Sequence, residues 1–140
     1  VGPMHTQALE LEDMITDHKM TGSVIVSLPE EMPVNETASL ESELTGDIGV
    51  SVDRVIMNAL YPDRFLKKEM TALKPLAGSD DPQLRAVQRA ALTQSRRAGA
   101  QQEQLERLEQ LVSTPITTLP FIFEPELTLK AARGLAEGLT

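Results

Sequence analysis

Three short apolar runs rich in β-branched residues divide the chain and predict strands. They occupy residues 23–28, 52–57 and 116–119. In the first run apolar side chains occupy both alternating sets of positions, which is typical of a strand buried on both faces of a parallel sheet. A proline or an asparagine closes each run, so the strand ends are marked in the sequence.

The segments between these runs have apolar residues three and four positions apart, the spacing of helices that bury one face. The predicted helices cover residues 5–19, 33–44, 63–76 and 82–112, with a last one from about residue 126. Asp81-Pro82 has the N-cap and first-turn residues of a helix start. Beyond it the three- and four-residue spacing of apolar residues continues for about eight turns, and two of its positions are polar, Gln94 and Gln101. These apolar positions form a seam along one face of the helix, and we expect that face to pack against a neighbouring element.

The alternation of helices and strands favours an α/β fold with parallel strands, because the connections are long enough to cross over the sheet. Three strands are few for a doubly wound domain. We therefore expect a partial doubly wound parallel sheet of about three strands with a helical insertion at 63–114. Residues 1–140 would then be one part of a single larger domain.

Composition excludes several classes of function. The 140 residues include no Cys, two His and four aromatic residues. Disulfide scaffolds, thiolate zinc sites, cysteine nucleophiles and histidine-rich metal sites are therefore excluded. No apolar run approaches the length of a membrane span and no signal peptide opens the sequence. A cytoplasmic protein is expected.

Charge is distributed unevenly along the chain, whose formal net charge is -8. Residues 1–63 hold twelve acids against two bases, whereas residues 64–97 hold eight bases against three acids. The acidic total argues against nucleic acid as a partner. The basic stretch is either a solvated helical face or a surface that docks an acidic partner. The second interpretation leaves open a non-enzymatic helical interaction module that acts through residues 64–97.

Known catalytic motifs are absent, so position in the fold is the remaining guide to chemistry. The sequence has no GxxxxGK[ST] loop, no GxGxxG and no histidine near a candidate serine. Glu30 and Glu31 could act as acid and base, although adjacent acids after a strand are more often helix-start charges. Ligands of open parallel sheets bind at the carboxyl ends of the strands.

Three segments follow the predicted strands: 29–33, 58–62 and 120–123. The Asn58 amide can donate and accept hydrogen bonds together, which matches the edge of an adenine ring. Pro120 and Phe121 could give the apolar wall that such a ring needs. The alternative is that Asn58 only caps a turn.

At these same positions the chain resembles the C-terminal portion of the ArsA-like anion-transporting ATPases, especially actinobacterial members. The similar stretches are Ser23–Thr37, with its Pro-Glu-Glu-Met-Pro run, then Val55–Asn58, Leu119-Pro120 and the opening Val1-Gly2-Pro3. The family includes arsenite-pump ATPases and the ATPase that targets tail-anchored membrane proteins. The resemblance covers nearly the whole chain and is most specific at residues 29–33.

The resemblance implies a dimeric P-loop ATPase of the deviant Walker A type that uses ATP or ADP with Mg²⁺. Its phosphate loop would lie in an N-terminal half, so the present residues would form a C-terminal fragment that is inactive alone. By resemblance Asn58 contacts adenine, and the loop at Pro120 and Phe121 borders the same pocket. Pro29 and Glu30 would lie near the nucleotide and the dimer interface.

The partners that the resemblance implies are an identical or paired ArsA-like subunit, the N-terminal half of the ATPase and a membrane-protein client. The helical stretch falls where the family builds its client- or metalloid-binding subdomain. Because Cys is absent, neither a zinc-linked dimer nor thiolate binding of arsenite is supported.

Overall fold

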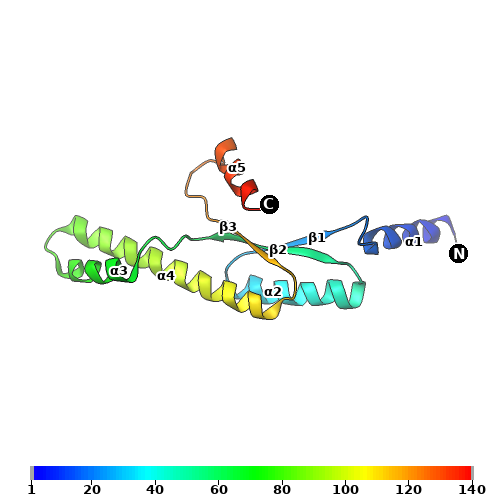
Figure 1. Cartoon of the computed structure of the whole chain (residues 1–140), viewed down its shortest axis with the longest axis horizontal. Coiled ribbons are helices and arrows are strands. Elements are labelled where there is room, and N and C mark those ends of the chain that lie inside the picture. Colours follow the sequence, from blue (N-terminus) through cyan, green and yellow to red (C-terminus); the bar gives the residue numbers. More distant parts are fainter. Residues whose placement is uncertain (1, 140) are drawn as a thin grey trace.

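The computed structural model describes residues 2–139. Helices and strands alternate along the chain, and each connection between two strands contains at least one helix (Figure 1). The elements are α1 (Pro3–Thr16), β1 (Ser23–Ser27), α2 (Glu31–Ser42), the π-helical turn η1 (Glu43–Ile48), β2 (Val52–Leu60), α3 (Lys67–Leu73), the 3₁₀ turn η2 (Lys74–Gly78), α4 (Pro82–Leu111), β3 (Ile116–Pro120) and α5 (Leu129–Glu137).

The strands form one parallel sheet in the order β1-β2-β3. The core lies between one face of this sheet and the helices α2 and α4. Ile25, Val55 and Met57 come from the sheet, and they meet residues of α2 and α4 that include Val34 and Leu108. The α/β class and the three parallel strands predicted from the sequence are confirmed.

The opposite face of the sheet is largely uncovered, so the prediction that the first strand is buried on both faces was wrong. Val24 is 52% exposed and Val26 62% exposed. The residues just after α5 (Leu129–Glu137) reach this face. There the Nη1 of Arg54 donates to the carbonyl of Leu139 (3.0 Å) and to the Oγ1 of Thr117 (3.2 Å).

Helix α4 begins where the sequence predicts. The Asp81 carboxylate accepts the amide of Gln83 (2.8 Å) and Pro82 occupies the first turn. Figure 1 shows that the second half of α4 runs beside α2 under the sheet, whereas its first half projects outward with α3. Leu105 and Leu108 are accordingly buried, while Val87 is 57% exposed. The apolar seam of α4 therefore packs against α2 and the sheet in its second half, and lies beside α3 in its first half.

Several element boundaries differ from the prediction; α3, for example, begins at Lys67 rather than at residue 63. Strand β2 continues past Met57 to Leu60, with an irregular register in which Ala59 has a φ of 61°. Helix α5 starts at Leu129 rather than near residue 126, because the Thr128 side chain accepts the amide of Ala131 (3.2 Å) and caps the helix there. Threonine is a good N-cap, and this local hydrogen bond fixes the start.

The molecule is elongated, with α1 at one end and the α3–α4 pair at the other (Figure 1). The structure describes all of α1 and buries none of its residues. Its apolar side chains, among them Leu11 and Ile15, face outward. Among residues 2–139, no helix has both the length and the hydropathy of a membrane span.

Candidate functional site

The carboxyl ends of the three strands meet at a hollow of about 240 Å³, here called the strand-end hollow. The parallel topology brings these ends to one edge of the sheet. Each strand end contributes residues to the wall. They are Leu28, Pro29 and Glu30 after β1, Ala59 and Tyr61 at β2, and Phe121 after β3, with Arg97 and Gln101 added by α4.

An aromatic cluster forms one side of the strand-end hollow. The rings of Tyr61 and Phe121 stack with centroids 4.7 Å apart and planes at 19°. Phe123 meets both rings edge-on, at 5.3 Å from Tyr61 and 4.9 Å from Phe121. Offset and edge-on pairs of this kind hold each ring in a defined orientation. The hollow therefore has a preformed flat wall.

Helix α4 holds Tyr61 by two side chains. The Nη1 of Arg97 donates to the Tyr61 hydroxyl oxygen (2.8 Å), and its guanidinium carbon lies 5.0 Å from the ring centroid. The Oε1 of Gln101 accepts the Tyr61 backbone amide (2.7 Å). Arg64 lies over Phe123 in the same way, 4.5 Å from its centroid. The helical insertion is thus attached directly to the strand-end hollow.

Pro29 and Glu30, two predicted site residues, line the strand-end hollow. Pro29 is buried, and Glu30 is the exposed N-cap residue of α2, whose carbonyl accepts the amide of Val34 (3.1 Å). The neighbouring Glu31 lies 4.0 Å from Arg107 on α4 and is mostly exposed. This placement favours the helix-start interpretation of the two carboxylates over the acid–base one.

Asn58 and Pro120 lie beside the strand-end hollow and are not among the residues that line it. Asn58 is half-buried, and its Oδ1 accepts the backbone amide of Ala59 (2.9 Å). This bond is local, like that of a turn cap, although it reaches the next residue rather than the one two positions on. Pro120 ends β3 opposite Leu60, and the next amide, of Phe121, donates to the Leu60 carbonyl (2.8 Å). Pro120 therefore places Phe121 in the wall.

Tyr61 lies in the strand-end segment 58–62 that the sequence indicates, whereas Arg97 and Gln101 are site residues that the sequence does not indicate. Arg97 belongs to the basic stretch 64–97, yet it joins Tyr61 across 36 positions of sequence. A signal was present in Gln101, one of the two polar positions in the apolar seam of the long helix. Polar residues on a packed helix face usually have a specific partner.

The carboxylates of the described residues form no metal centre. Among residues 2–139, no group of three or more His, Cys, Asp or Glu side chains is arranged to hold a metal ion. The residues that line the strand-end hollow offer aromatic stacking, apolar contact and hydrogen bonding, together with the cation Arg97 and the carboxylate of Glu30.

The family model described as anion-transporting ATPase matches residues 3–75, which is just over half of the chain. The chain therefore belongs to the anion-transporting ATPase family, and the three-stranded sheet with its helices is a partial fold of the P-loop NTPase type. The matched range includes β1, β2 and the hollow residues that follow them. No curated protein matches the chain.

Proposed function

We propose that this chain supplies the adenine side of the nucleotide site of an anion-transporting ATPase, together with a helical partner-binding region. The observation that carries the proposal is the meeting of all three strand ends at one hollow with a stacked aromatic wall. In open parallel sheets this edge is where ligands bind. The nucleotide and Mg²⁺ of the whole protein follow from the family.

The strand-end hollow suits a flat ring and is too small for a complete nucleotide. Complete small-molecule sites occupy about 300–1,000 Å³, whereas the hollow holds about 240 Å³. Its apolar wall, from Pro29 and Phe121, fits the faces of a base. Polar groups of Gln101 and Glu30 stand at its rim, where a base presents its edge.

Asn58 would read the edge of the adenine in this proposal. Its Oδ1 keeps a second lone pair beyond the bond to Ala59, and the amide nitrogen supplies donors. Ala59, the next residue, lines the strand-end hollow, and the proposal requires the Asn58 side chain to turn toward a bound base. Pro29 and Glu30 would then lie beside the nucleotide and near the dimer interface.

The phosphates and Mg²⁺ would be held elsewhere in the ATPase. The chain has no Gly-Lys pair, and residues 2–139 offer no carboxylate cluster for a cation. We propose that an N-terminal half supplies these elements, and that the present residues are inactive alone. Dimerisation with an identical or paired subunit, a membrane-protein client and a cytoplasmic location belong to the same proposal.

A hydrolysis assay tests whether the adenine site and the phosphate site come from different parts of the ATPase. The chain by itself should release no phosphate from Mg²⁺-ATP above the rate of buffer. Adding the half that carries the phosphate-binding loop should produce activity. Asn58→Ala and Phe121→Ala should then raise KM for ATP with little change in kcat, whereas Ser42→Ala, exposed and remote on α2, should change neither. Hydrolysis by the chain alone would refute the proposal.

The second candidate is a non-enzymatic module that binds an acidic partner through residues 64–97. It is favoured by the exposure of the cations of this stretch, including Lys67, Lys68, Arg89 and Arg96. This candidate expects binding of a polyglutamate peptide that weakens steeply with salt and is lost in Arg89→Glu/Arg96→Glu. Adenosine should have no effect on that binding, which separates the two candidates.

A further inference from the structure

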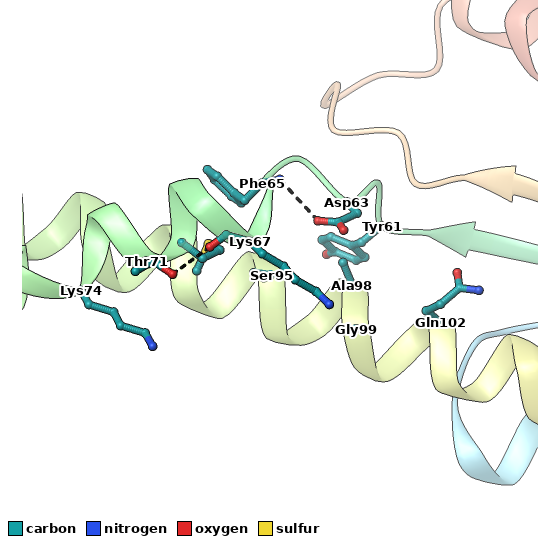
Figure 2. Close-up of a pocket in the computed structure, with 11 residues that line it drawn as sticks. Tyr61, Asp63, Phe65, Lys67, Thr71, Lys74, Ser95, Ala98, Gly99 and Gln102 are labelled. Atoms are coloured by element: carbon teal, nitrogen blue, oxygen red, sulfur yellow. Dashed lines mark hydrogen bonds between the residues drawn. The ribbon is translucent and has the colours of Figure 1, made fainter.

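A second and larger cavity opens between α3 and α4, on the other side of Tyr61 from the strand-end hollow. This α3–α4 cleft holds about 650 Å³, within the range of small-molecule sites. Figure 2 shows its walls, which come from the loop after β2, one face of α3 and the middle of α4. Three separate segments therefore converge on it.

Cations outnumber acids in the α3–α4 cleft. Lys67 at the start of α3 and Lys74 at the start of the turn η2 both line it. In Figure 2 the Lys67 side chain extends across α4, and Lys74 lies at the opposite end of the cleft from Gln102. Asp63 is the one carboxylate among the lining residues, and it already accepts the amide of Phe65 (3.3 Å). In a chain of net charge -8, this cleft attracts anions.

The body of the α3–α4 cleft is apolar and reaches the backbone of α4. Phe65 and Met70 form one wall, and Ala98 and Gly99 form the other. A Cβ built on Gly99 meets no atom within 4 Å, so the space beside this helix is open. Glycine in a helix interior costs about 1 kcal/mol relative to alanine. Here it leaves room for a ligand against the helix.

We propose that the α3–α4 cleft is a binding site for a small organic anion that has an apolar body and one carboxylate or phosphate group. The anionic group lies at the ammonium group of Lys67, whose side chain extends toward Gly99 in Figure 2, while Lys74 at the other end of the cleft adds positive potential. The apolar body lies between Phe65 and Met70 on one side and Ala98-Gly99 on the other. This inference does not depend on the nucleotide site.

A titration of the intact ¹⁵N-labelled chain with 2-naphthoate, followed by amide chemical shifts, tests the site. We expect saturable shifts at residues of the cleft, centred on Gly99, Phe65 and Thr71. The uncharged analogue 2-naphthylmethanol should bind at least about threefold more weakly, the effect of one exposed ion pair. Shifts centred on α1 or on the open sheet face, equal binding of the alcohol, or no saturable shift would overturn the proposal.

Matched variants locate the ligand. Gly99→Leu fills the cleft and should weaken 2-naphthoate binding about tenfold or more, whereas Ala100→Leu, exposed on another face of α4, should not. Lys67→Gln should weaken binding about threefold, Lys74→Gln should weaken it less, and the neighbouring Lys68→Gln should leave it unchanged. Urea unfolding of each variant shows whether it is folded. Unchanged binding in a folded Gly99→Leu chain would overturn the proposal.

Discussion

Glu41 on α2 is a buried carboxylate, 7% exposed, that organises the turn between α4 and β3. Its Oε1 accepts the amides of Ser113 (3.1 Å) and Thr114 (2.8 Å), and its Oε2 lies 3.2 Å from the Ser113 nitrogen. A buried charge is tolerated only when hydrogen bonds replace its water. One side chain therefore fixes where β3 enters the sheet.

The residue Glu41 should contribute measurably to stability. Glu41→Gln keeps an acceptor oxygen and removes the charge, so we expect a loss of about 1–2 kcal/mol in the free energy of unfolding. Urea denaturation measures this. Glu36→Gln, exposed on the same helix, serves as the control and should stay within about 0.5 kcal/mol of the parent. Equal stability of both variants would contradict the role given to Glu41.

Tyr61 and Arg97 should be energetically coupled, because they share a hydrogen bond and a cation–π contact. A double-mutant cycle with Tyr61→Leu and Arg97→Gln should give a coupling of about 0.5–1 kcal/mol, the size expected at an exposed site. Urea denaturation of the four proteins supplies the numbers. Strict additivity would show that α4 is not attached to the strand end through this pair.

At the scale of elements, α4 combines two functions in one 30-residue helix. Its second half completes the core through Leu105 and Leu108, and its first half forms the cleft with α3. The helix also buries side-chain atoms of two glutamines without hydrogen-bond partners among the described residues 2–139, which lowers the free energy of unfolding. These atoms are the Oε1 of Gln104 and the Nε2 of Gln94.

Replacing one of these glutamines should stabilise the protein. Gln104→Met keeps the shape of the side chain and removes an unpaired buried acceptor, which should raise the free energy of unfolding by about 1 kcal/mol. Thermal and urea unfolding both report this change. Gln110→Met, exposed one and a half turns further along, should be close to neutral. A destabilised Gln104→Met would mean that the amide has a partner in solution.

The elements that sequence predicted best are those with strong local signals. Asp81-Pro82 placed the start of α4, and Pro120 placed the end of β3. The start of α5 was misplaced because the acids and proline at 124–126 also favour a helix start, and only the side-chain bond of Thr128 decides between them. Contacts such as Arg97 with Tyr61 depend on how α4 packs, which local patterns do not encode.

At the scale of the whole molecule, the sheet is covered on one face only. Parallel sheets in α/β proteins are normally covered on both faces, yet Val24 and Val26 are largely exposed. The prediction that the first strand is buried on both faces is therefore wrong for Val24 and Val26. The same apolar pattern led to the prediction of a partial sheet, which the structure confirms. We propose that other parts of the ATPase cover this face.

We propose that the strand-end hollow binds the adenine end of a nucleotide, and a titration of the intact ¹⁵N-labelled chain with adenosine, which lacks phosphates, is the sharpest test. Binding there should give saturable amide shifts at Glu30, Ala59, Tyr61 and Phe121, none from tripolyphosphate at these positions, and weaker binding in Phe121→Ala. Adenosine shifts confined to other regions, or a Phe121→Ala chain that is folded and binds equally well, would contradict it.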